Sequence, residues 1–383
     1  SHDPSTLVSA MAAVTQHLGF GVTVNLSYES PYQFARRFAS LDHLTHGRIG
    51  WNIVTGYLDS AERLIGQKGL KDHDLRYEQA EEFLELCYKF WEGSWEDDAV
   101  QKDKLNRVFT DPSKVHAIQH QGKFFQSQGV FQVSPSIQRT PVLYQAGASS
   151  KGLAFATQHA EAMFIGADTP EKLKQQVDKI RALALSHGRD EQAIKLFVGI
   201  SVVTAETDEL AQEKLAEYIR YASPEAGLVH FSSSVGIDLA QFTDDEAIPY
   251  KQTNSIASVN NKFKEQKVTR ADLKAQHVLG GRYPLIVGSG KTVAEKLIQL
   301  LDETGVDGFN LTRTVAPESH QDFIHWVIPE LQERGRYKTA YETGSLRHKL
   351  FAQGDRLAAD HPVQQYRCQS SSPDSKTQQK QTA

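Results

Sequence analysis

The sequence predicts an α/β protein with a mostly parallel sheet, and the architecture it favours is a (β/α)8 barrel. Six short apolar segments alternate with amphipathic segments of helical period, the order expected of repeated strand–helix units. No G-x-G-x-x-G follows any predicted strand, which weakens the alternative, a doubly wound dinucleotide-binding sheet. The chain has 383 residues, 39% of them hydrophobic, which is enough for one large domain or two ordinary ones.

The elements follow from capping residues and from the spacing of apolar side chains. Asp3 and Pro4 are typical of a helix start, and Gly19 ends the first predicted helix. Apolar residues recur at helical spacing from Phe34 to Leu44, so that face of the second helix is predicted to be buried. The predicted helices are 7–18, 32–44, 77–91, 149–159, 170–187, 208–221, 292–304 and 319–334. The predicted strands are 21–27, 49–54, 141–145, 162–165, 195–203 and 308–312.

Two polar stretches interrupt this alternation. Residues 94–138 are rich in Gln, Asp, His and Ser and are predicted to form an inserted hairpin or two on the surface. Residues 222–285 form a second, irregular insertion. The tail from 368 to 383 is polar and low in complexity, so it is predicted to be disordered. The predicted organisation is one barrel domain over 1–367, followed by this tail.

Composition argues against several classes of partner. The formal charge of −5 and the pI of about 6.3 give no electrostatic reason to expect nucleic acid or an anionic membrane. No apolar segment approaches the length of a membrane span, and the first residues lack a signal-peptide pattern. The two cysteines, Cys87 and Cys368, cannot form a disulfide framework, so a reducing compartment, the cytoplasm, is expected. Cys87 falls on the inward face of its helix and is predicted to be a core thiol.

Some motifs resemble catalytic signatures but fail on spacing. The segment Gly288-Ser-Gly-Lys-Thr292 looks like a phosphate loop, but Leu285 stands where that motif requires its first glycine, so an ordinary helix-capping turn is predicted. His116 and His120 are four residues apart, as on one helix face, but Ala117 replaces the glutamate of a metalloprotease motif. A solvated histidine pair is therefore predicted, with no metal site. No G-x-S-x-G supplies a hydrolase nucleophile.

The segment Gln145-Ala-Gly-Ala-Ser-Ser-Lys-Gly152 joins a predicted strand directly to a helix. Ser149 and Ser150 stand at the helix N-terminus, where free N–H groups and the helix dipole favour an anion such as phosphate. The alternative is that one serine is only an N-cap, and the segment alone leaves both interpretations open.

Other polar residues stand near strand ends. His73 and Tyr77 are four residues apart and face the same way if both lie on a helix start, so they could reach a phosphate; a surface histidine and a packing tyrosine are the alternative. Thr23 and Asn25 stand toward the end of the first predicted strand, and in a barrel they would face inward at its carboxyl end. The far end of the strand 49–54 carries Asn52, Thr55 and Tyr57. These positions suit a ligand at the carboxyl end of a parallel sheet.

Taken together with the segments below, these residues make the chain resemble the flavin-dependent monooxygenases of the bacterial luciferase-like superfamily. The resemblance is greatest to the branch that holds nitrilotriacetate monooxygenase, dibenzothiophene-sulfone monooxygenase and the pristinamycin synthases. The segments that carry it, in family order, are Met11-Ala-Ala-Val-Thr15, Gly19-Phe-Gly-Val-Thr23, 31–37, 41–45, Gly47-Arg-Ile-Gly-Trp-Asn-Ile-Val-Thr55, Trp91-Glu-Gly-Ser-Trp-Glu-Asp-Asp98, Asp111-Pro-Ser-Lys-Val-His116, 138–150 and Val306-Asp-Gly-Phe-Asn310.

The resemblance implies a TIM-type (β/α)8 barrel with insertions that binds reduced FMN at the carboxyl ends of its strands. The flavin contacts that it implies here are Thr23, Asn52, His73, Tyr77, Ser149 and Ser150. Ser149, Ser150 and Tyr77 would hold the phosphate, and the others would lie toward the ring or the ribityl chain. The resemblance implies that the family's first two strands have no counterpart in this chain, so the six predicted strands would be strands three to eight, and the missing part would include an acidic residue near the flavin.

The resemblance also implies the chemistry. Reduced FMN, supplied by a separate NAD(P)H-dependent flavin reductase, would react with molecular oxygen, and one oxygen atom would enter a small organosulfur, amine or aminopolycarboxylate substrate. No residue is predicted as acid or base. A homo-oligomer, dimer or tetramer, is expected. The alternatives are a flavin or deazaflavin hydride-transfer enzyme of the same superfamily, and a truncated homologue without catalytic activity.

Overall fold

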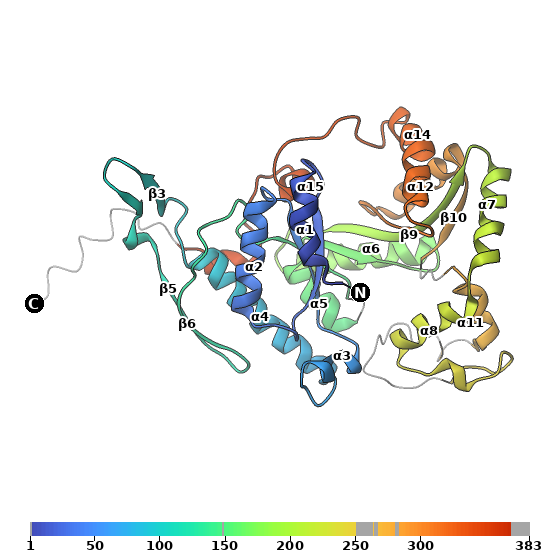
Figure 1. Ribbon diagram of the computed structural model, residues 1–383, viewed down its shortest axis with the longest axis horizontal. Coiled ribbons are helices and arrows are strands. Elements are labelled where there is room, and N and C mark those ends of the chain that lie inside the picture. Colours follow the sequence, from blue (N-terminus) through green and yellow to red (C-terminus); the bar gives the residue numbers. More distant parts are fainter. Residues whose placement is uncertain (1, 148, 250–262, 264–266, 280–282, 369–383) are drawn as a thin grey trace, which may run out of the picture. The chain divides into compact units, whose positions relative to one another are not determined.

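The computed structural model of the chain describes residues 2–147, 149–249, 263, 267–279 and 283–368 (Figure 1). Its helices are α1 (Pro4–Ala13), α2 (Pro31–Leu44), α3 (Asp59–Leu64), α4 (His73–Gly93), α5 (Ser150–His159), α6 (Pro170–Ser186), α7 (Asp208–Tyr221), α8 (Pro224–Val235), α11 (Arg270–Gln276), α12 (Gly290–Thr304), α13 (Glu318–Asp322), α14 (Ile328–Glu333) and α15 (Leu346–Phe351). Its strands are β1 (Phe20–Asn25), β2 (Ile49–Val54), β3 (Val100–Asp103), β4 (Val108–Thr110), β5 (Ala117–Gln121), β6 (Gln126–Val130), β7 (Val142–Gln145), β8 (Ala162–Ile165), β9 (Lys195–Ala205), β10 (Leu285–Ser289) and β11 (Gly308–Thr312).

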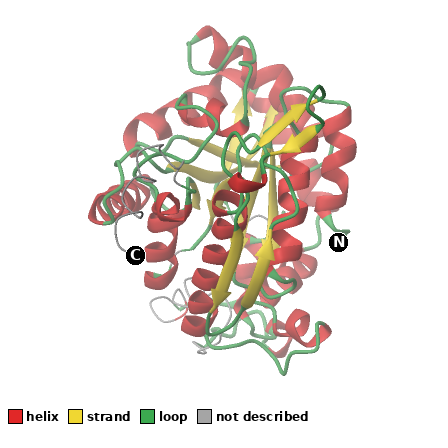
Figure 2. Ribbon diagram, turned by 90° about the vertical axis from the view of Figure 1, so that its left-hand side faces the viewer, coloured by secondary structure: helices red, strands yellow, loops and turns green. Residues whose placement is uncertain are grey.

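The main sheet has seven strands in the order β1-β2-β7-β8-β9-β10, and β11 also pairs with β9. The strands β7 and β8, and then β8, β10 and β11 with β9, are paired in parallel. Strand β9 accommodates two of these partners because it is long: its residues from Phe197 to Ser201 pair with β11, and those from Ser201 to Ala205 pair with β10. Figure 2 shows these strands in yellow among the helices in red. The predicted α/β class with parallel strands is confirmed.

The chain divides into two compact units. The first consists of Ser1–Trp51, Glu78–Val142 and Thr343–Ala383, and the second of Asn52–Tyr77 and Leu143–Glu342. The prediction of a single barrel domain over 1–367 remains a prediction. Among the described residues, no helix combines the length and the apolar character that crossing a membrane requires.

The core of the second unit lies between one face of its strands and the helices α6 and α12. Alternate residues of β9 are buried in it, namely Leu196, Val198, Ile200 and Val202, together with Met163 and Ile165 of β8. The helices contribute Leu173, Val177 and Ile180 from α6 and Val293, Ala294 and Leu297 from α12. Because side chains alternate along a strand, the residues between these, such as Phe197 and Gly199, lie on the opposite face of the sheet.

The core of the first unit is aromatic. Phe34 and Phe38 of α2 pack with ring centroids 4.4 Å apart, and Trp51 of β2 lies 4.3 Å from Phe34. All three are fully buried. The predicted inward face of this helix is confirmed except at Leu44, which is 59% exposed, because it lies at the last residue of the helix, where the apolar face has passed the core.

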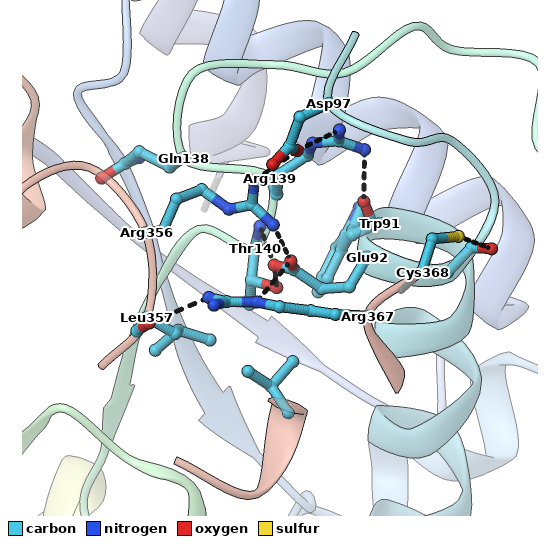
Figure 3. A network of polar contacts seen from close by, with 12 residues as sticks. Trp91, Glu92, Asp97, Gln138, Arg139, Thr140, Arg356, Leu357, Arg367 and Cys368 are labelled. Atoms are coloured by element: carbon cyan, nitrogen blue, oxygen red, sulfur yellow. Dashed lines mark hydrogen bonds and ion pairs between the residues drawn. The ribbon is translucent and has the colours of Figure 1, made fainter. Parts of the chain in front are cut away.

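A buried charge network joins distant parts of the first unit (Figure 3). The Glu92 side chain, at the end of α4, has no solvent exposure. Its carboxylate accepts a hydrogen bond of 2.7 Å from Thr140 Oγ1 and pairs with Arg356 and Arg367. Arg356 also binds the exposed Asp97. The segment before residue 368 is thus held to the end of α4 by charge-assisted hydrogen bonds.

Most predicted elements are present, and the differences have local causes. The strand 49–54 and the two surface hairpins within 94–138, β3–β4 and β5–β6, are confirmed. The first helix is shorter than predicted and ends at Ala13, and the helix 319–334 contains a π-helical turn at Phe323–Val327. The prediction of an irregular region over 222–285 was wrong in part, because the region contains α8 and α11. The predicted disordered tail lies outside the described residues beyond Cys368.

Candidate functional site

The turn from β7 to α5 forms one side of the candidate site. Strand β7 ends at Gln145, and Ser149 is the N-cap of α5, with its Oγ accepting a hydrogen bond of 3.0 Å from the Gly152 N–H. Ser150 is the first helical residue and is exposed. Ser149 therefore caps the helix. Its hydroxyl and the exposed Ser150 both lie at the helix N-terminus, where the partial positive charge favours an anion.

Glycine allows this turn to approach its neighbours closely. A Cβ atom at Gly152 would lie only 2.7 Å from Tyr77 Oη and 3.1 Å from Ser149 Oγ. A Cβ atom at Gly147 would lie 2.9 Å from the Gly152 Cα. Any side chain at Gly152 would therefore fill the space between the tyrosine hydroxyl and the helix N-terminus.

The first turn of α4 supplies the other side of the site. The His73 Nε2 atom lies 3.3 Å from Ser149 Oγ, and its Nδ1 lies 3.0 Å from a carboxylate oxygen of Asp74. The rings of His73 and Tyr77 have centroids 5.1 Å apart, so both side chains point the same way, as their spacing predicts. The hydrogen bond from His73 lowers the pKa of Asp74, so this carboxylate is ionised and orients the imidazole.

Tyr77 lies at the centre of this group. Burial raises the pKa of its hydroxyl, and hydrogen bonding with Ser149 and Gln145 opposes only part of that shift. Tyr77 is therefore a neutral hydrogen-bond donor at neutral pH. The contribution of Gln145 was missed by sequence reasoning, although its place as the last residue of a strand was the available signal.

The six predicted flavin contacts lie in different parts of the structure. His73, Tyr77, Ser149 and Ser150 lie around the β7–α5 turn. Asn52 is half-buried on β2, in the same compact unit. Thr23 lies on β1 in the first unit and is exposed there.

The motifs that failed as catalytic signatures on spacing have structural roles. Ser289 is the N-cap of α12, accepting a hydrogen bond from the Thr292 N–H at 3.3 Å, so the predicted capping turn is confirmed. Cys87 is fully buried, which raises the pKa of its thiol and confirms the predicted core position. Across the described part of the chain, no group of three or more His, Cys, Asp or Glu side chains could hold a metal ion.

The solvated histidine pair was a wrong prediction. His120 lies on the strand β5, its side chain is 5% exposed, and it is 3.2 Å from a carboxylate oxygen of Glu82. His116 lies just before the strand and is 2.9 Å from Glu96. Extended chain rises about 3.3 Å per residue, so residues four apart lie too far from each other to act as a pair. Each histidine therefore contacts a carboxylate of its own.

Comparison with known proteins decides the family. The model of the luciferase-like monooxygenases matches residues 1–308. The chain belongs to the luciferase-like monooxygenase family. It is 46% identical to the dimethyl-sulfide monooxygenase of Hyphomicrobium sulfonivorans, over 96% of this chain and 77% of that protein. It is also 46% identical to the long-chain alkane monooxygenase of Geobacillus thermodenitrificans strain NG80-2, over 96% of this chain and 80% of that protein.

Solved structures of other luciferase-like monooxygenase family relatives agree. The crystal structure of DmoA from Hyphomicrobium sulfonivorans superposes with a TM-score of 0.88 at 46% identity, over 96% of this chain and 79% of that chain. A riboflavin lyase with modified FMN and riboflavin superposes with a TM-score of 0.90 at 39% identity, over 96% of this chain and 82% of that chain. The luciferase-like fold and the enzyme class, a monooxygenase, are thus confirmed.

The predicted branch of the family is confirmed as well. The dibenzothiophene-sulfone monooxygenase of Rhodococcus erythropolis is 36% identical, and a nitrilotriacetate monooxygenase component of Aminobacter aminovorans is 35% identical. A pristinamycin IIA synthase component of Streptomyces pristinaespiralis is 30% identical. The expectation that two barrel strands are missing finds no support in these comparisons.

Proposed function

We propose that this luciferase-like monooxygenase uses reduced FMN and molecular oxygen to oxidise a small organic substrate, and that the β7–α5 turn holds the FMN phosphate. The observation that carries the proposal is the group of polar atoms near Gly152: the hydroxyls of Ser149 and Tyr77, the N-terminus of α5 with Ser150, and the His73 imidazole beside Ser149. The hydroxyls and the free N–H groups of the helix N-terminus suit a phosphate, because each can donate a hydrogen bond to an anionic oxygen.

The close packing at Gly152 supports this assignment. Because Gly152 has no side chain, Tyr77 Oη and Ser149 Oγ can both come close to the N-terminus of α5, so their hydroxyls converge on one region. When bound, reduced FMN supplies the two electrons that activate oxygen. In this proposal Ser149, Ser150 and Tyr77 bind the phosphate, and His73, oriented by Asp74, positions the Ser149 hydroxyl through its Nε2. Asn52 and Thr23 are assigned to the ring or ribityl chain on the family resemblance alone.

The partners follow from the same proposal. A separate NAD(P)H-dependent flavin reductase would deliver the reduced cofactor, as the family resemblance implies. The enzyme would work in the cytoplasm as a homo-oligomer, and its substrate would be an organosulfur, amine, aminopolycarboxylate or hydrocarbon compound. The relatives named for dimethyl sulfide, long-chain alkane and nitrilotriacetate support this range.

The test is titration of the protein with FMN and reduced FMN. In the double variant Ser149→Ala with Ser150→Ala, we expect binding to weaken by about 1.5–3 kcal/mol for each hydrogen bond to the phosphate that is lost. Ser223→Ala is the matched control, because Ser223 is also a helix N-cap in the second unit, accepting from the Ala226 N–H at 3.3 Å. Equal flavin affinity in the double variant and the control would remove the phosphate assignment.

The oxygen dependence of turnover distinguishes monooxygenation from hydride transfer. With reduced FMN supplied, we expect substrate oxidation to consume oxygen and to stop under anaerobic conditions. Substrate conversion that continues without oxygen would favour hydride transfer instead.

A further inference from the structure

The first turn of α4 is also tied to the chain that leaves β2. Arg76, one residue before Tyr77, donates a hydrogen bond from its Nη1 atom to the backbone carbonyl of Gly56. Gly56 follows the last residue of β2 by two positions, and its φ of 81° lies in the left-handed region that glycine adopts without strain. All of these residues belong to the second unit. Arg76 therefore holds the turn that follows β2.

The Arg76 side chain is in an unusual environment for a cation. Only 6% of the residue is exposed, and arginine is seldom buried so deeply unless its charge is compensated. Glu62 of α3 is 2% exposed. Burial lowers the pKa of Arg76, and the charges of nearby acidic groups, Glu62 among them, offset part of that shift. Arg76 and Glu62 are thus a buried cation and a buried carboxylate that interact electrostatically.

The residue before Gly56 links this buried pair to the candidate site. Burial raises the pKa of the Tyr77 hydroxyl, and hydrogen bonding with the Thr55 side chain is one of the effects that oppose this rise. Two successive residues, Thr55 and Gly56, are therefore held by two successive residues of α4. The positive charge of Arg76 also lowers the pKa of Tyr77. The same charge would favour an anionic ligand oxygen beside the Tyr77 hydroxyl.

We infer that Arg76 is a positioning residue for the FMN phosphate: it holds the Gly56 carbonyl, keeps Thr55 against the Tyr77 hydroxyl, and so directs that hydroxyl toward the N-terminus of α5. This inference rests on the proposed function and adds a residue that acts on the phosphate site through Tyr77. A buried ion pair is costly to desolvate and often stabilises a fold no more than apolar residues of similar volume. Its place beside Tyr77 therefore favours a role in the site over a role in stability alone.

The test compares FMN with riboflavin, the same flavin without the phosphate, by equilibrium titration of the full chain. Arg76→Met keeps an unbranched apolar side chain and removes the charge and the donors. We expect it to weaken FMN binding by about tenfold or more, because a misplaced Tyr77 hydroxyl loses a hydrogen bond to a charged group. Riboflavin affinity should change by less than about twofold. Arg76→Lys, which keeps the charge and a donor, should recover part of the loss.

Arg189→Met is the matched control. Arg189 is 3% exposed, belongs to the same unit and donates a hydrogen bond of 2.6 Å to the backbone carbonyl of Ala160. Its loss should lower the unfolding temperature but leave the preference for FMN over riboflavin unchanged. If Arg76→Met does not fold because Glu62 is left without a counter-charge, the variant that combines it with Glu62→Gln removes both charges and is titrated in its place.

A double-mutant cycle tests whether Arg76 acts through Tyr77. Tyr77→Phe removes the hydroxyl, and in that background Arg76→Met should cause no further loss of FMN affinity. If the two losses add, Arg76 acts by another route and the inference is wrong. A role in stability alone would lower the unfolding temperature in both backgrounds without changing the ratio of FMN to riboflavin affinity.

The outcomes distinguish this inference from the proposed function. A parent protein that binds FMN no better than riboflavin would overturn the phosphate assignment and the inference with it. A parent protein that prefers FMN, loses the preference in the Ser149→Ala, Ser150→Ala variant and keeps it in Arg76→Met would overturn the inference alone.

Discussion

At the scale of single residues, Glu92 shows how the first unit compensates a buried charge. Its carboxylate is fully buried, and two arginines that are about a quarter exposed compensate its charge. A buried ion pair need not stabilise a protein relative to an apolar alternative, but removing one partner leaves the others without compensation. Glu92 is therefore a position where a small chemical change has a large effect.

For Glu92→Gln we expect the free energy of unfolding to fall by about 3 kcal/mol, the lower end of the range for breaking a buried pair, because Arg356 and Arg367 can turn toward water. Urea denaturation measures the change. Glu78→Gln is the matched control, since the Glu78 side chain is more than half exposed and pairs at 2.8 Å with the exposed Lys123 of the same unit, and a loss of under about 1 kcal/mol is expected there. Equal losses in both variants would contradict this account of the network.

The candidate site could be predicted from sequence only where local geometry decides it. The positions of Ser149 at a helix start and of His73 one turn before Tyr77 follow from spacing, and both are found as predicted. The contribution of Gln145 and the hydrogen bond from Arg76 to the Gly56 carbonyl depend on which strands and helices are neighbours. That information is absent from a single sequence, so these contacts could not be anticipated.

At the scale of elements, the Glu82 side chain of α4 binds the turn of the hairpin β5–β6. The Glu82 carboxylate accepts hydrogen bonds from the N–H groups of Phe124 at 2.9 Å and Phe125 at 2.7 Å, in the turn of the hairpin, and lies 3.2 Å from His120. Burial raises the pKa of Glu82, but these hydrogen bonds together lower it by more, so the net pKa is below its usual value.

The lowered pKa of Glu82 determines how this contact's contribution to stability changes with pH. A carboxyl group whose pKa is lowered by folding stabilises the folded state above its unfolded pKa of about 4.3, and this stabilisation is lost as the pH falls through the lower, folded value. We expect the amides of Phe124 and Phe125 to exchange with solvent faster in Glu82→Ala than in the parent protein at pH 7. Below the folded pKa the two proteins should converge; hydrogen-exchange rates that differ equally at all pH values would count against the assignment.

The elements were predicted well wherever capping and periodicity agree. Strand β2 and helix α2 fall within a residue of their predicted bounds because an N-cap or a glycine marks each end. Strand β10 was not predicted as a separate element, since its residues are mostly half-exposed and it pairs only with the last part of β9. Helices α8 and α11 lie in a polar region, where their caps, Ser223 and Thr269, were the overlooked signals.

At the scale of the whole molecule, ligand binding and stability are linked. A ligand that binds only the folded chain raises the free energy of unfolding by about 2.7 kcal/mol at 100 times its dissociation constant. We therefore expect saturating FMN to raise the unfolding temperature of the parent protein, and to raise it less in the Ser149→Ala, Ser150→Ala variant. Riboflavin, which lacks the phosphate, is the control ligand: if it protects the parent protein as well as FMN does, the phosphate contributes nothing to binding.

The ion pairs of Glu92 also limit when the first unit can finish folding during synthesis. Arg356 lies 264 residues further along the chain, so it leaves the ribosome long after Glu92. At about 5–20 residues per second, the delay is roughly 13 to 53 s. During that interval the Glu92 carboxylate has neither of its arginine partners, so the charge network of the first unit is completed only when the last part of the chain has been made.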